Sequence, residues 1–473
     1  MKYIALFAVL AAGSAGGAPR PGGGYAVVVS RATHEQTAWR EVVDALVRKH
    51  GAKTILYDDA VGSCLPELKR LFPRYACFVA RPDEAGRRFV VDVHRLTRKL
   101  DADPYGDVLW GIVTGYSPAD ALRIASTAEP LVIRRAGAGT GLDLDLFDAG
   151  KWFSEGKAGL YCEKLPGGKP ENKQGPADST KAIVDFLNEE KPALFVTSGH
   201  ATERDWQIGY SYRNGQFRCR GGKLVGIDRE RNVYPVDSPN PKVYLGAGNC
   251  LIGHIKRRDC MALVWLGSGG ANQFVGYTVN TWFGAMGWGT KDRLLDLPGR
   301  HNLAEAFFLA NQEIVRRLHR KFPDQADVDL DRYDLETDRT VLGRAAARLG
   351  YRTWDKTLRE HLGLLWDRDT VAFYGDPAWD ARLARRELPL AITLTEKAGT
   401  FTFTVRATRD AKSRKPPAVL LPRRLADVKV TAGAEHDPLI TDTFLMLAKP
   451  ADLKAGETME VVFGAKPLER GEH

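Results

Sequence analysis

Two apolar stretches decide the fold of this chain: Ala193-Leu-Phe-Val-Thr-Ser-Gly-His200 and Val243-Tyr-Leu-Gly-Ala-Gly-Asn-Cys250. Each has the length of a strand that is buried on both faces, and turn residues bound it. Parallel strands place their carboxyl ends at one edge of the sheet, where open α/β sheets bind their ligands, so His200 and Cys250 are expected to meet there. An imidazole beside a thiol is a base–nucleophile pair, and the sequence therefore predicts a catalytic site at these two residues.

The backbone around the pair is predicted to serve the same reaction. Amide N–H groups at Cys250 and beside His200, in the segments that contain Gly199, Ala201 and Asn249, are suited to stabilise an oxyanion. Simpler interpretations stay open, because a buried cysteine is usually a small apolar residue and a histidine beside a glycine is often a turn residue.

His254 is the alternative base. It follows Cys250 by four residues, and on a helix the two side chains would share one face. Cys250, His254 and Cys260 do not have the spacing of a standard metal site, so no metal is predicted there.

Predicted strands and helices alternate along most of the chain. The predicted strands lie at 25–30, 54–57, 75–80, 108–114, 158–163, 193–199, 243–249, 262–266 and 272–279, and the predicted helices at 37–50, 65–72, 90–100, from 118, at 179–190 and at 302–322. This order predicts an α/β fold with a parallel or mixed sheet flanked by helices, in two subdomains at 19–135 and 136–385. Short alternating segments rich in Thr, Val and Phe then predict a β-sandwich over 386–473.

The amino terminus has the pattern of a secretory signal peptide over residues 1–18. Lys2 precedes a short apolar run, and small residues follow it up to Ala18. The apolar run is too short to span a bilayer, and no other stretch is long enough for a transmembrane segment. We therefore expect a secreted, periplasmic or cell-surface protein. The six cysteines permit disulfides in that environment without fixing their connectivity.

Composition narrows the classes of partner. The chain has 473 residues and a formal charge of +9, but no dense basic run with interleaved aromatic residues, so no nucleic-acid partner is expected. The acidic run Asp327, Asp329 and Asp331 lacks the central glycine of an EF-hand loop. A structural calcium site of another geometry stays open, no cofactor is required, and the oligomeric state is left without a prediction.

Several motifs in order resemble the caspase-like (clan CD) cysteine peptidases, especially the gingipain-type branch. The two strand ends, Ser-Gly-His200 and Asn-Cys250, look like that family's catalytic pair. Three further stretches are similar to its strand–turn–helix segment, its glycine-rich turn after the cysteine strand, and the motif that closes its peptidase domain: Trp110-Gly-Ile-Val-Thr-Gly-Tyr-Ser-Pro-Ala-Asp120, Leu266-Gly-Ser-Gly-Gly-Ala-Asn-Gln-Phe-Val-Gly276 and Phe373-Tyr-Gly-Asp-Pro377. The resemblance covers roughly residues 25–470.

The resemblance implies a caspase-like catalytic unit at 136–385 and a carboxy-terminal immunoglobulin-like module at 386–473. It implies a secreted cysteine endopeptidase acting on proteins or peptides, with Cys250 as nucleophile and His200 as general acid/base. Glu155 and Asp148 are the candidates for an acid that orients His200. The side-chain pocket is expected after Gly270, with Trp282 and Trp288 in it.

The chain also departs from the family pattern. Ala201 follows the histidine where the family has Gly, and Asn249 precedes the cysteine where Ala is common. Two alternative functions therefore remain: a catalytically inactive relative that serves as a surface binding or structural protein, and a thiol amidase.

Overall fold

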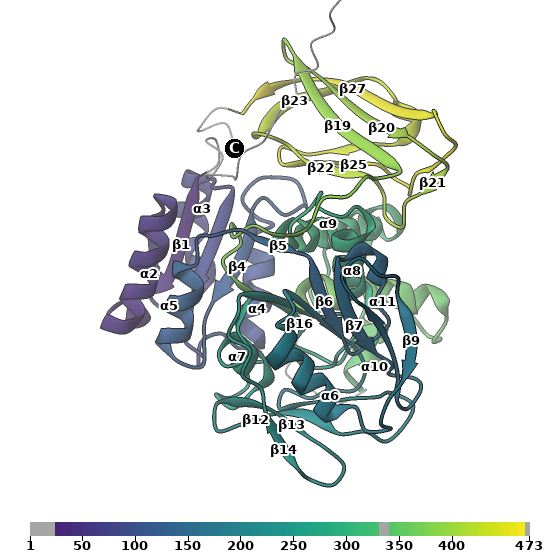
Figure 1. Cartoon of the computed structure of the whole chain (residues 1–473). Coiled ribbons are helices and arrows are strands. Elements are labelled where there is room, and N and C mark those ends of the chain that lie inside the picture. Colours follow the sequence, from purple (N-terminus) through teal and green to yellow (C-terminus); the bar gives the residue numbers. More distant parts are fainter. Residues whose placement is uncertain (1–23, 331–339, 469–473) are drawn as a thin grey trace, which may run out of the picture.

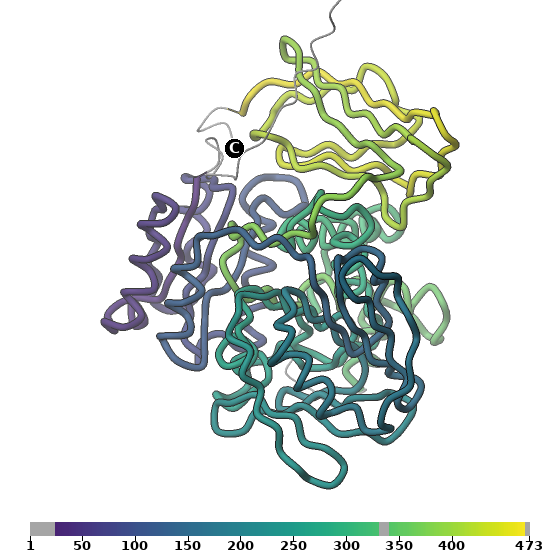
Figure 2. Tube along the Cα trace, viewed as in Figure 1, coloured from purple at the N-terminus to yellow at the C-terminus, as the bar shows by residue number. Residues whose placement is uncertain are grey.

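The computed structural model describes residues 24–330 and 340–468 (Figures 1 and 2). The predicted signal peptide and Asp331 of the acidic run lie outside these residues. Within them, no helix is long and apolar enough to cross a membrane.

A 12-stranded mixed sheet forms the centre of the α/β part. In spatial order its strands are β2 (Lys53–Tyr57), β1 (Tyr25–Ser30), β3 (Tyr75–Val79), β4 (Leu109–Val113), β17 (Val371–Gly375), β16 (Ala271–Tyr277), β15 (Lys242–Gly246), β10 (Leu194–Thr197), β6 (Arg135–Ala138), β7 (Ala149–Phe153), β8 (Leu160–Lys164) and β9 (Glu171–Gln174). The strands from β2 to β17 are parallel to one another, as are those from β16 to β7. The two parallel blocks meet at the antiparallel pair β16–β17, so the sheet has two carboxyl-end edges on opposite sides.

Helices flank this sheet, as predicted. They are α1 (Arg31–His34), α2 (Thr37–His50), α3 (Leu65–Leu71), α4 (Arg87–Leu96), α5 (Pro118–Ser126), α6 (Thr180–Asp185), α7 (Met261–Leu266), α8 (Ala285–Asp296), α9 (Leu303–Lys321), α10 (Thr340–Arg348) and α11 (Lys356–Thr370). α5 starts at residue 118, as predicted, and the side chains of Ser117 and Asp120 form a capping box before Pro118 at the first helical position.

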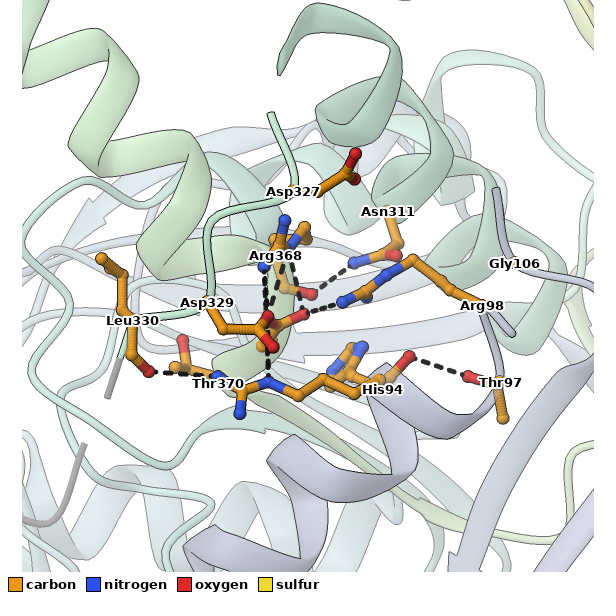
Figure 3. A network of polar contacts seen from close by, with 12 residues as sticks. His94, Thr97, Arg98, Gly106, Asn311, Asp327, Asp329, Leu330, Arg368 and Thr370 are labelled. Carbon is orange, nitrogen blue, oxygen red and sulfur yellow. Dashed lines mark hydrogen bonds and ion pairs between the residues drawn. The ribbon is translucent and has the colours of Figure 1, made fainter. Parts of the chain in front are cut away.

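A polar network joins α4 and the residues after it to α11 (Figure 3). Arg98 pairs with the buried Asp369 at 2.7 Å, and Arg368 pairs with Asp329 at 3.0 Å. Asp327 of the same acidic run lies 3.2 Å from His319. These two described carboxylates of the run therefore face cationic or titratable side chains of the fold.

One predicted strand is wrong. Residues 262–266 belong to helix α7, whose six residues are all buried. A short apolar run that is buried on every side has no period to separate helix from strand, so the sequence pattern could not decide this segment. The segment between His200 and β15 folds as a separate antiparallel sheet of β11 (Asp205–Gln207), β12 (Gln216–Arg220), β13 (Lys223–Ile227) and β14 (Val233–Pro235).

The carboxy-terminal residues form several small antiparallel sheets above the α/β part (Figure 1). The largest joins β19 (Leu390–Lys397), β20 (Thr400–Ala407), β27 (Thr458–Pro467) and β23 (Leu425–Ala432). The others are β21 (Ala411–Lys412) with β26 (Asp452–Leu453), and β22 (Ala418–Leu420) with β25 (Phe444–Met446) and β24 (Leu439–Ile440); β18 (Ala381–Leu383) pairs instead with β5 (Leu131–Ile133). Phe401, Phe403 and Phe463 belong to a buried cluster distinct from the main core.

Candidate active site

Strands β10 and β15 lie side by side and parallel, as the sequence predicts. Thr197 is level with Gly246, and one hydrogen bond continues the ladder beyond the strands, from the N–H of Ala247 to the carbonyl of Thr197 at 2.9 Å. His200 and Cys250 follow these two strand ends. Their segments therefore leave the sheet at the same edge.

Asn249 ties the two segments together. This buried side chain accepts a hydrogen bond from the Thr197 hydroxyl at 2.6 Å and donates one to the Gly199 carbonyl at 3.2 Å. The Thr197 hydroxyl is also 2.6 Å from the hydroxyl of Tyr244. The residue before Cys250 is thereby fixed to the residue before His200, a structural role that the sequence prediction of an oxyanion contact at Asn249 did not include.

The backbone groups predicted to stabilise an oxyanion make few hydrogen bonds of their own. Ala201 faces Trp206 across an isolated antiparallel bridge, and the carbonyl of His200 accepts from Gln207 at 2.9 Å. Within the described part of the chain, no backbone hydrogen bond uses the N–H of Cys250. The N–H groups of Gly199, Ala201 and Asn249 likewise donate to no backbone acceptor within the described residues, so the geometry singles out none of the predicted oxyanion donors.

Cys250 differs from every other cysteine in its exposure. All six cysteines lie in the described residues as free thiols, and the other five are buried. Burial raises the pKa of the Cys219 thiol to about 11 and that of Cys260 to about 12, which keeps them protonated and unreactive. Cys250 is partly exposed, and its sulfur accepts a hydrogen bond from the backbone N–H of Thr281 at 3.3 Å.

His200 is exposed and is held by an aromatic contact. Its imidazole stacks on the ring of Tyr210, with centroids 4.9 Å apart and planes inclined by 24°. The carbonyl of Glu155 accepts the N–H of Tyr210 at 2.6 Å and that of Ser211 at 3.1 Å. Tyr210, the ring on which His200 stacks, is thus fixed at this sheet edge by the backbone of Glu155.

The structure separates the two predicted orienting acids. Glu155 follows the carboxyl end of β7, and its carboxylate accepts hydrogen bonds from the hydroxyls of Thr140, at 2.8 Å, and Ser198. Asp148 precedes the same strand and pairs with Arg386 at 2.8 Å. Because β7 runs parallel to its neighbour β6, and β6 runs parallel to β10, Glu155 lies at the edge of His200 and Asp148 at the opposite edge.

The two tryptophans also lie in different surroundings. Trp288 of α8 packs against the end of β15, since a Cβ added at Gly248 would lie 3.2 Å from its ring. The ammonium of Lys291 lies 4.7 Å from the Trp288 ring centroid. Trp282 instead stacks on Trp366 of α11 at 4.9 Å. The structure therefore brings Trp288 to the cysteine segment, while Trp282 packs toward α11.

The alternative base, His254, contacts an arginine side chain. Residues 250–254 are not helical, and the buried His254 lies 3.0 Å from Arg87, measured between Nδ1 and Nη2. Among the described residues, the carboxylates that lie close enough to share a cation are those of Asp101, Asp107 and Asp442, which belong to other segments.

An open groove of about 1230 Å³ begins at Tyr210, beside His200. Its walls are the loops at 210–216 and 227–234. Tyr210, Thr281 and Ser198 contribute to the site, but the sequence prediction gave none of them a role. Their roles follow from neighbours distant in sequence.

No protein-family model and no curated protein matches this sequence. Among solved structures, the chain is similar to the crystal structure of the Arg-specific cysteine proteinase gingipain R (RGPB). The identity is 12%, the TM-score is 0.41, and the match covers 94% of this chain and 91% of that one. A likeness of this size carries no information about catalytic residues, so the chemistry of the site rests on the contacts described above.

Proposed function

We propose that the chain is a cysteine endopeptidase in which Cys250 is the nucleophile and His200 the general acid/base. One observation carries the proposal: neighbouring parallel strands deliver both residues to one sheet edge, and Asn249 ties their segments together. The exposure of Cys250 among five buried thiols supports it.

The reaction follows from the positions of these groups. The imidazole of His200 accepts the thiol proton, and the sulfur of Cys250 attacks the scissile carbonyl carbon. The N–H of Cys250 stabilises the oxyanion, and the imidazolium gives its proton to the leaving amine. Water then hydrolyses the thioester, which releases the acid product and restores the thiol.

The substrate in this proposal is an extended peptide that lies along the groove beside Tyr210. The proposal includes export of the chain by its residues 1–18 and an immunoglobulin-like module at 386–473. Glu155 acts as a positioning residue, because it holds both Ser198 and the backbone of Tyr210.

Active-site labelling tests the function. The folded protein is treated with a thiol-directed peptidyl acyloxymethyl ketone, and the adduct is located by mass spectrometry. We expect modification at Cys250, and loss of peptide hydrolysis in Cys250→Ala but not in the matched control Cys219→Ala.

Unlabelled Cys250 together with unchanged hydrolysis in Cys250→Ala would overturn the proposal. Labelling without turnover of any member of a peptide library would favour the inactive binding protein. Turnover of small amides alone would favour the amidase.

A further inference from the structure

We infer that Thr281 is a positioning residue for the sulfur of Cys250, an inference that rests on the function proposed above. Thr281 follows β16, the strand beside β15, and makes two contacts with the cysteine segment. Its N–H donates to the sulfur at 3.3 Å, and its hydroxyl donates to the carbonyl of Asn249 at 2.9 Å.

These two contacts end a regular series. The N–H of Gly253 donates to the carbonyl of Tyr277, and the N–H of Leu251 donates to that of Val279, both at 2.9 Å. The next step, two residues along on each segment, joins Asn249 to Thr281. In a regular antiparallel ladder the carbonyl of Asn249 would accept the backbone N–H of Thr281.

Here the hydroxyl of Thr281 donates to the carbonyl of Asn249 instead. The N–H of the same residue is then free to donate to the sulfur of Cys250. Leu251 has a φ of 57°, in the left-handed region, and this turn places the cysteine side chain against Thr281. A side-chain hydroxyl has thus replaced a backbone donor at the one position where the backbone donor is needed by the nucleophile.

The segment that carries Thr281 is anchored from behind. The indole N–H of Trp366 in α11 donates to the carbonyl of Asn280 at 3.1 Å, and Trp282 stacks on the same indole. The donor therefore has a fixed direction. A hydrogen bond to the charged form of a group favours that form, so the N–H of Thr281 stabilises the thiolate over the thiol.

Other ionisable groups lie at the same edge. They are His200 after β10, Glu155 after β7, and Lys291 on α8, whose pKa is lowered by burial. All of them are unchanged in variants of Thr281. A difference between such variants in the alkylation rate of Cys250 therefore reports the contact with Thr281.

The test compares Thr281→Val, which keeps the shape and loses the hydroxyl, with Thr281→Ser, which keeps the hydroxyl. The rate of Cys250 alkylation by iodoacetamide is measured from pH 5 to 10 by site-resolved mass spectrometry. We expect Cys250 of the valine variant to be alkylated about tenfold more slowly at pH 6.5. The serine variant should stay within about threefold of the wild type, and kcat on peptides should fall in the valine variant with KM unchanged.

Thr281→Ala is the second hydroxyl-free variant, used if the valine variant does not fold. An alkylation profile unchanged in the folded hydroxyl-free variant, or equally shifted in serine, would overturn the inference. If Cys250→Ala abolishes turnover while the Thr281 profile is unchanged, the inference fails and the peptidase function stands. If no peptide is cleaved but the shift is present, the positioning role stands and the peptidase function fails.

Discussion

The imidazole of His200 is held at the sheet edge by an aromatic ring. Within the described residues no carboxylate is hydrogen-bonded to this imidazole, and its recorded side-chain contact is the stack on Tyr210. Glu155 acts one step away, through its carbonyl to Tyr210 and its carboxylate to Ser198. A stacked aromatic contact is worth roughly 0.5–1.5 kcal/mol, enough to decide which orientation an exposed imidazole adopts.

Tyr210→Ala should therefore lower kcat by up to about tenfold, because about 1.4 kcal/mol of orientation corresponds to that factor. Tyr210→Phe keeps the ring and should keep kcat within about twofold. Both values are measured on a fluorogenic peptide. Since Tyr210 also lines the groove, KM is recorded separately, and equal kcat in the alanine and phenylalanine variants would contradict a role in holding His200.

At the scale of elements, strand β15 begins with a buried lysine. The ammonium of Lys242 donates to the carbonyls of Ser238, of Asn240 at 2.9 Å and of Gly269 at 2.6 Å. These contacts join the start of β15 to the turn that precedes β16. The site at the other end of β15 depends on this register, because the strand carries Cys250 at its carboxyl end.

Lys242→Met should destabilise the fold by about 3 kcal/mol, because it leaves buried carbonyl acceptors unpaired at a cost of about 1–3 kcal/mol each, partly offset by removing a buried charge. The free energy of unfolding is measured by urea titration. The matched control is Lys223→Met at the exposed first residue of β13, expected within about 0.5 kcal/mol of the wild type. Equal stability of the two variants would show that the hydrogen bonds from Lys242 to these three carbonyls do not stabilise the fold.

The sequence predicts those elements whose signal is local. The strands before His200 and Cys250 and the helix at 37–50 have a clear period or a bounded apolar run, and their positions are confirmed. The strand predicted at 262–266 is wrong, because a fully buried run has no hydrophobic period to separate helix from strand. Glu155 and Asp148 flank one strand, β7, and only its direction in the sheet decides which acid reaches the site. The role of Thr281 could not be predicted, because it depends on a turn after β16 that has no signal in the sequence pattern.

At the scale of the molecule, arginines fasten the carboxy-terminal sheets to the α/β part. Arg293 donates to the carbonyl of Pro416 at 3.3 Å and Arg300 to that of Ile392 at 2.9 Å. From the other side, Arg424 donates to the carbonyl of Asp107 at 2.6 Å and pairs with Asp442. Asp101, Asp107 and Asp442 lie together at this junction, so its stability depends on their ionisation.

Burial, and then the charges of Asp101 and Asp442, raise the pKa of Asp107 to about 9, while Arg424 opposes the shift. An unfolded aspartate titrates near 4, so the folded state holds the extra proton between these values. This contribution to stability is fully present below about pH 4 and is lost as the pH rises toward 9, with a slope of at most about 1.4 kcal/mol per unit.

Asp107→Asn removes this titration and keeps an oxygen to accept the N–H of Leu100, which Asp107 accepts at 3.0 Å. Urea unfolding at pH 5, 7 and 8.5 should show the wild type losing more stability than the variant as the pH rises. Asp103, whose pKa is raised to about 7 chiefly by burial, leaves a smaller slope in both proteins. Asp452→Asn, at an exposed carboxylate, should follow the wild type. Parallel slopes for wild type and Asp107→Asn would mean that Asp107 is already ionised at the junction, its charge balanced by Arg424.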